Sequence, residues 1–150
     1  MNDVPEHLDH VRSGTVSEGV AGIVWRLAKA SSVAVAAACG GQGDRLLGTL
    51  AMDSLDAWGV AASLMDGEAA HLCHRPASSS ENFLELVCEA EQVLAGRPIE
   101  QWPRGTHFLV VKVCDLIGAV RLADSKGLPS VGALLCPDGH AVRGRGTHGA

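Results

Sequence analysis

In the middle of this chain, apolar and polar positions alternate with the period of an α-helix. Between Ser78 and Gly96 the apolar residues recur every three or four positions and form one face. Ser78 followed by Glu81 fits a capping box at the start of a helix, and Gly96 is a favourable stop signal. The predicted apolar face comprises Phe83, Leu86, Val87, Ala90, Val93 and Leu94. A second helix is predicted over residues 108–126, lined by Val113, Leu116, Ile117 and Val120 and ended by Gly127.

The rest of the chain from Arg45 onward reads as short strands. A polar break at Asp53–Asp56 divides the first apolar run, and Asp66-Gly67 is a hairpin turn signal. The expected strands comprise residues 45–52, 59–65, 68–75, 97–103 and 128–137. The order strand, hairpin, helix, strand, helix, strand predicts a mixed α/β sheet with right-handed crossovers in its second half.

The N-terminal part offers two interpretations. Residues 1–18 are polar and acidic and are expected to be poorly ordered, followed by a helix over about 16–30 and a run of small residues up to Gly40-Gly41. We expect residues 1–44 to be an extension, partly helical or disordered. The alternative is a lipoprotein signal, with a basic pair before the small-residue run and a lipid-bearing Cys39 after it.

Composition narrows the class of protein and leaves its partner open. The chain has 150 residues, of which 47% are hydrophobic and only 3% aromatic, enough for one domain with an aliphatic core. Its net charge is −5, but residues 96–150 carry 7 Lys and Arg against 4 Asp and Glu. A basic C-terminal part is compatible with a polyanionic partner. Five widely spaced cysteines without a C-x-x-C pattern indicate buried free thiols in a reducing, cytoplasmic environment.

Candidate chemistry falls at three places. Asp53 and Asp56 lie beside the first expected strand, and Glu100 ends the strand after the capped helix. If these strands are neighbours, Asp53 and Glu100 converge and can bind Mg²⁺ or Mn²⁺. Arg143 and Arg145 flank Gly144 in a loop suited to gripping phosphate. The third place, the run HLCH at residues 71–74, has one pair of soft ligands without a second pair at zinc-like spacing, which favours an ordinary strand.

The order and spacing of these motifs resemble one nuclease family. Residues 45–146 are similar to the RuvC-type Holliday-junction resolvases of the ribonuclease H-like group, with the pattern SLDAWG at residues 54–59 after the first acid and the Ile99-Glu100 pair in a later strand. The resemblance extends to GLPSVGALLCPDGHAVRGRG at residues 127–146, where His140 takes the place of the usual lysine. It implies a ribonuclease H-like (RuvC-type) domain over residues 45–150, incomplete at its C-terminus.

The resemblance also implies a function. A metal-activated water would attack a DNA phosphate, with Asp53 and Glu100 as the catalytic, metal-binding acids and Mg²⁺ or Mn²⁺ as cofactor. His140, Arg143 and Arg145 would contact branched or duplex DNA, and the enzyme would work in DNA recombination, with a homodimer as a further expectation. The family's last acidic pair lies beyond Ala150, so the chain is either an active endonuclease or a degenerate, inactive member. The rival interpretation is a small-ligand sensory domain of the GAF type, which AWGVAASLMDGEAAHLC at residues 57–73 also resembles.

Overall fold

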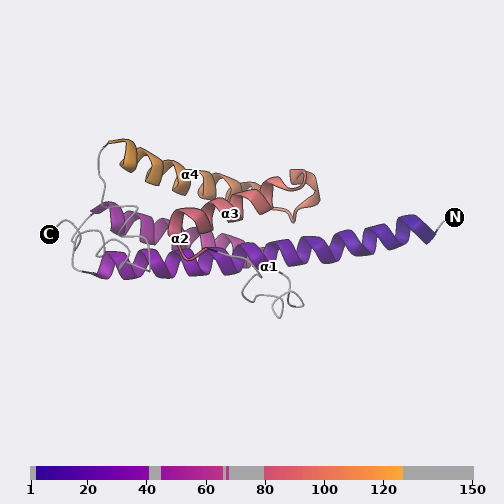
Figure 1. Ribbon diagram of the computed structural model, residues 1–150. Helices are drawn as coiled ribbons and strands as arrows, with labels where there is room; N and C mark the ends of the chain where they lie inside the picture. Colours follow the sequence, from indigo (N-terminus) through magenta and orange to yellow (C-terminus); the bar gives the residue numbers. More distant parts are fainter. Residues whose placement is uncertain (1–2, 41–44, 66, 68–79, 127–150) are drawn as a thin grey trace.

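The computed structural model is an all-helical four-helix assembly. It describes residues 3–40, 45–65, 67 and 80–126, with the side chains of the first helix described from Val16 onward. The elements are α1 (Asp3–Cys39), α2 (Arg45–Ser63), α3 (Phe83–Ala95), the short 3-10 helix η2 (Ile99–Gln101) and α4 (Thr106–Ser125). In Figure 1 the N-terminal end of α1 projects well beyond the other helices.

The four helices form a ring, and each helix runs antiparallel to its two neighbours. α1 packs on α2 and α3, and α4 packs on the same two helices from the other side. Arg26 of α1 donates to Glu89 of α3 at 2.9 Å. Lys112 of α4 pairs with Asp56 of α2, and an added Cβ at Gly105, just before α4, would lie 3.7 Å from Leu64, just after α2. The short α1–α2 and α3–α4 connections join antiparallel neighbours, whereas α2 and α3, separated by residues 64–82, run in the same direction on opposite sides of the ring.

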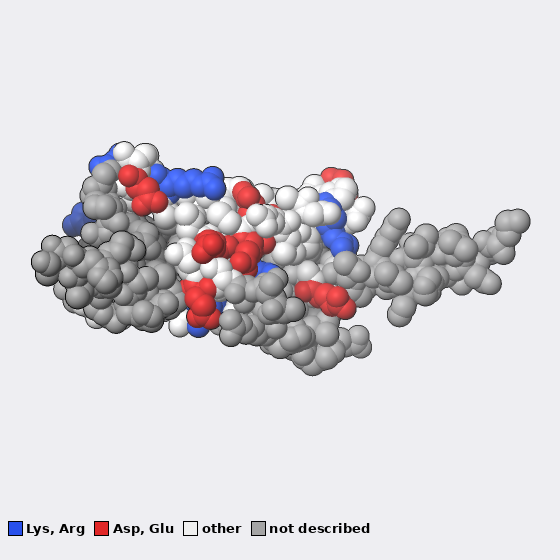
Figure 2. All heavy atoms as spheres, viewed as in Figure 1, with Lys and Arg blue, Asp and Glu red and all other residues white. Residues whose placement is uncertain are grey.

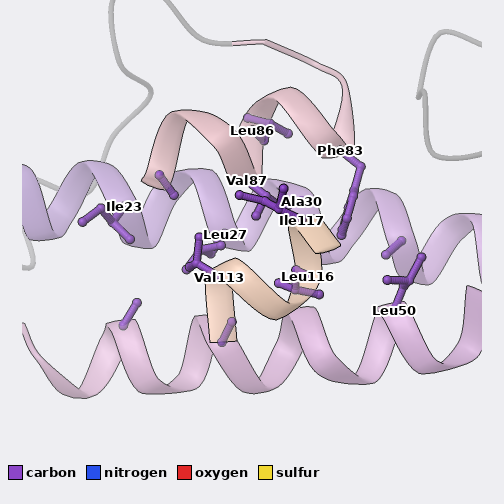
Figure 3. Packing of buried hydrophobic residues seen from close by; sticks show 14 of the residues in the cluster. Ile23, Leu27, Ala30, Leu50, Phe83, Leu86, Val87, Val113, Leu116 and Ile117 are labelled. Carbon is purple, nitrogen blue, oxygen red and sulfur yellow. The ribbon is translucent and has the colours of Figure 1, made fainter. Parts of the chain in front are cut away.

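The core is aliphatic and comes from all four helices. Leu27, Leu50 and Phe83 are fully buried, and the core side chains labelled in Figure 3 come from all four helices. Buried Ser54 avoids an unpaired hydroxyl by donating to the carbonyl of Ala51 at 3.0 Å, one turn back in its own helix. Side chains spaced three and four residues apart on every helix therefore close one continuous core.

The predicted helices are confirmed, with one change at a cap. α3 and α4 occupy the expected regions, and the expected apolar faces are buried, apart from the partly exposed Val93. α3 starts later than the predicted capping box: Asn82 is its N-cap and accepts a hydrogen bond from the backbone N–H of Glu85 at 3.1 Å. Gly105 precedes α4 with φ of 96°, a left-handed conformation that favours glycine.

The predicted ribonuclease H-like mixed α/β fold is wrong. The part of the chain that the structure describes contains no strand. The two strands expected over residues 45–52 and 59–65 form the single helix α2, and the strand expected over 97–103 contains η2. α2 has few β-branched residues and many Ala and Leu, a composition that favours helix. The strands expected over 68–75 and 128–137 lie outside the described residues.

The N-terminal segment is also more regular than expected. α1 is one helix from Asp3 to Cys39, so it includes both the segment expected to be poorly ordered and the small-residue run. By length and composition Val16–Cys39 could cross a membrane, a property that signal sequences and core helices share. In this fold its apolar residues, such as Ile23 and Leu27, are buried against the other helices. In this structure the segment packs as one of the four helices of the bundle.

Candidate functional site

The structure places the two acids predicted to share a metal ion on two different helices. Asp53 is exposed in the middle of α2, and Glu100 is exposed in η2. Leu64, just after α2, lies close to Gly105, and Asp53 is eleven residues, or about 16 Å, back along α2 from there. The strand edge that was expected to bring Asp53 and Glu100 together is replaced by helices. Among the described residues, three or more His, Cys, Asp or Glu side chains nowhere gather as they would around a metal ion.

The charged side chains near Asp53 form a surface ion pair. Asp56, one turn further along α2, accepts a hydrogen bond from Lys112, which raises the pKa of Lys112 above its ordinary value. Surface ion pairs of this kind contribute little to stability. Figure 2 shows acidic side chains gathered over α3 on one face of the molecule. The predicted DNA-contacting residues, His140, Arg143 and Arg145, lie outside the described residues.

An apolar cleft lies where α3, η2 and α4 meet. Its volume is about 530 Å³, within the range typical of binding pockets. The cleft is lined mainly by the apolar side chains of Leu94, Ile99, Val110 and Val111, with Cys114 beside them. Three polar or charged side chains also contribute to its lining: Glu91, Arg97 and His107. An apolar floor bordered by a few polar groups can bind the apolar side of another molecule.

Trp102 fixes the connection that borders this cleft. Its side chain is buried, and its indole N–H donates to the carbonyl of Leu94 at 3.0 Å. The guanidinium of Arg97 lies 5.4 Å from the centre of the indole ring, within cation–π range. On the other side, an added Cβ at Gly19 of α1 would lie 3.0 Å from the ring, so glycine is what lets the indole approach α1. Trp102 therefore holds η2 against the bundle.

The outward face of α4 continues the cleft with exposed apolar side chains. Phe108 is 60% exposed, Val111 57% and Leu122 55%, and Val111 also lines the cleft. Together with Asp115 and Gly118 these residues recur at alternating spacings of three and four along the exposed side of α4. We call Phe108, Val111, Asp115, Gly118 and Leu122 the α4 seam. Exposed apolar residues on the outer side of a helix mark a surface that another molecule can cover.

The sequence carried a signal for this surface. The predicted helix over 108–126 has buried residues on one side, and Phe108, Val111 and Leu122 lie on its opposite side. An amphipathic surface helix would carry polar residues there. The remaining lining residues could not be found in this way, because they come together only when η2 folds back between α3 and α4.

The cysteines differ in their environments. The described Cys39, Cys88 and Cys114 are free thiols, but Cys39 and Cys114 are exposed, so the expectation of buried thiols is wrong for both. Cys88 is half-buried, and this burial raises the pKa of its thiol, partly opposed by the neighbouring Arg121. Since the thiolate is the reactive form, we expect Cys88 to react more slowly than the two exposed thiols.

This difference gives the first testable prediction. In dilute solution at pH 8, a short pulse of N-ethylmaleimide should alkylate Cys114 about tenfold faster than Cys88, as measured on peptides by mass spectrometry. Burial and the raised pKa both act in this direction, since pH 8 lies below the raised pKa of Cys88. In denaturant the two thiols should react at similar rates. Equal rates in the folded protein would contradict the packing of Cys88 against α4.

Comparisons of the chain with protein-family models, with curated proteins and with solved structures found no match.

Proposed function

We propose that this protein is a helical docking module that binds an amphipathic helix of a protein partner. The observation that carries the proposal is the joined apolar surface formed by the cleft and the α4 seam. The exposed apolar side chains of the seam, Phe108, Val111 and Leu122, span about 21 Å along α4, with the exposed Asp115 and Gly118 between Val111 and Leu122. A span of four helical turns exceeds what a small molecule would cover and matches the apolar stripe of a docked helix, read at positions i, i+3 or i+4, and i+7.

The border of this surface supports the same function. Glu91 and Arg97 offer one charge of each sign beside the cleft, and His107 adds a polar ring. Interfaces combine an apolar centre with a polar rim that fixes orientation.

Metal-dependent DNA cleavage remains a prediction of the sequence resemblance alone. It depended on a sheet that would bring Asp53 and Glu100 together, and on a loop that lies outside the described residues. The small-ligand alternative likewise stays a prediction, and an apolar cleft is present. Anchoring through Cys39 stays a prediction as well, with Cys39 exposed as the last residue of α1.

Binding at the apolar surface can be tested with the dye 1-anilinonaphthalene-8-sulfonate. The folded wild-type chain should bind the dye, with a rise in its fluorescence, and Val111→Glu should abolish most of that rise because Val111 belongs to both the cleft and the seam. A charge placed in an apolar site is poorly solvated there and weakens binding by about tenfold or more.

The matched control is Met52→Glu. Met52 is 67% exposed on α2 and contributes to neither the cleft nor the seam. This variant should bind the dye as the wild type does. Cooperative thermal unfolding of every variant must accompany the measurement, because loosely packed states also bind this dye. If Val111→Glu binds the dye as strongly as Met52→Glu does, the proposed function is wrong.

A further inference from the structure

Carboxylates border the middle of the α4 seam on the side of α2. Asp56 of α2 pairs with Lys112 of α4, which is the neighbour of the seam residue Val111. Asp53 lies one turn before Asp56, and the seam residue Asp115 lies one turn after Lys112. The hydrogen bond to Asp56 raises the pKa of Lys112, and the charges of Asp53 and Asp115 raise it further. One ammonium group is thus shared by three carboxylates, which leaves this side of the seam negative.

Another carboxylate borders the docking surface on the side of the cleft. Glu91 is exposed on α3 and lines the cleft together with Val111. In the ranges that the structure describes, neither Glu91 nor Asp115 forms a hydrogen bond or an ion pair. Val111, the residue that belongs to both the cleft and the seam, therefore has carboxylates on both sides.

The cations nearest to this surface lie toward its two ends. Arg97, two residues before η2, lines the cleft with its guanidinium 5.4 Å from the centre of the Trp102 ring. Arg121 lies ten residues after Val111, about 15 Å along α4, where it acts on Cys88. The excess of negative charge therefore stays at the middle of the surface.

This charge distribution bears on the kind of helix that can dock. A helix that covers the surface removes water from its carboxylates, and a carboxylate that loses water without gaining a partner is costly. Lys or Arg beside the apolar stripe of the docked helix replaces that water with charge-assisted hydrogen bonds, whereas Asp or Glu there is repelled. Because Asp115 interrupts the apolar residues of the seam, it needs such a cation close to the stripe itself.

We infer that the helix bound by the docking surface is a basic amphipathic helix, with Lys or Arg on both flanks of its apolar stripe. The inference rests on the proposed function and names the chemistry of its partner. The cations of one flank meet Asp53 and Asp115, and those of the other flank meet Glu91. An acidic helix with the same apolar stripe is excluded by like-charge repulsion, so the charges supply the specificity that the apolar contacts lack.

Two model peptides of about 18 residues, long enough to follow the whole seam, test the inference. Both carry the same stripe of leucine at positions i, i+3, i+4 and i+7. The remaining positions are lysine and glutamine in one peptide and glutamate and glutamine in the other. In fluorescence anisotropy at about 0.1 M sodium chloride, the lysine peptide should bind about tenfold more tightly or better, and about 0.5 M salt should remove most of this difference. Equal affinities, or tighter binding of the glutamate peptide, would overturn the inference.

Variants that each remove one negative charge separate local contacts from general attraction. Glu91→Gln and Asp115→Asn should each weaken binding of the lysine peptide by about three- to tenfold, because each removes a carboxylate that the peptide covers. Glu18→Gln is the matched control, since Glu18 is exposed on α1, across the ring from α4. Its affinity should stay within about twofold of the wild type, because distant surface charges are screened. Equal losses in all three variants would mean that only net charge acts, which contradicts the inference.

The dye experiment distinguishes failure of the inference from failure of the docking function. A glutamate peptide that binds as tightly as the lysine peptide leaves the docking function standing, with a partner of another charge. A wild-type chain that binds the dye but neither peptide removes the inference and restricts binding to the cleft. A chain that binds neither peptide nor the dye removes the docking function itself.

Discussion

Replacing Leu27 with alanine should lower the free energy of unfolding by about 2–5 kcal/mol, the range for a fully buried leucine. Leu27 is completely buried in α1, the helix that contacts both α2 and α3. Its removal leaves a cavity between elements that are held in place from several sides. Urea unfolding followed by circular dichroism at 222 nm measures the change.

The same substitution decides the role of α1. If the segment Val16–Cys39 leaves the bundle to cross a membrane or is removed as a signal, Leu27 cannot contribute to the stability of the remaining helices. A Leu27→Ala variant of unchanged stability would then be the result. Met52→Ala is the matched control, because this residue is exposed on α2. It should alter the free energy of unfolding by less than about 0.5 kcal/mol.

The sequence was informative where local pattern and tertiary packing agree. α3 carries a polar N-cap, a regular apolar face and a glycine after its last turn, so its position could be predicted within a few residues. α4 is similar on its buried side. For both helices, the residues that make the pattern are the residues that the core buries.

The region of α2 is wrongly predicted as two strands because the spacing of its apolar residues is compatible with both a helix and a strand. Acidic residues at positions 53 and 56 interrupt the apolar run and resemble a turn between two strands. In the structure they occupy the exposed side of one helix, while Ser54 and Ala57 beside them face the core. Exposed acids on a helix and acids in a turn look alike in a single sequence. The tendency of Ala and Leu to form helix was the deciding signal.

The wrong prediction of strands in the region of α2 also affected the predicted function. The resemblance to a resolvase depended on Asp53 ending a strand, and the same letters on a helix no longer support a shared metal site. A fold-level resemblance supports a function only through the geometry of its site. The cleft could not be predicted in its place, because Leu94, Ile99 and Val110 belong to three elements whose meeting depends on the burial of one side chain, Trp102.

Substituting Trp102 should therefore affect stability and dye binding together. Trp102→Ala should cost about 3–5 kcal/mol of unfolding free energy, as for other large buried aromatic residues. It removes the packing against Gly19 and the support for η2. Leu94 lies in the last turn of α3, where backbone carbonyls lack partners within the helix, and the indole N–H supplies one.

A series of variants separates the packing from the hydrogen bond. Trp102→Phe keeps most of the ring but leaves the Leu94 carbonyl without its donor, which should cost about 1–3 kcal/mol. Trp58→Phe is the control, since Trp58 is 39% exposed and accepts this change within about 0.5 kcal/mol. Urea unfolding gives these values, and dye titration of the folded variants reports on the cleft.

Trp102→Ala should bind the dye more weakly than Trp102→Phe, since η2 supplies Ile99 to the cleft only while the ring holds it in place. Equal dye binding by these two variants would mean that η2 keeps its position without Trp102, and that the cleft is fixed by α3 and α4 alone.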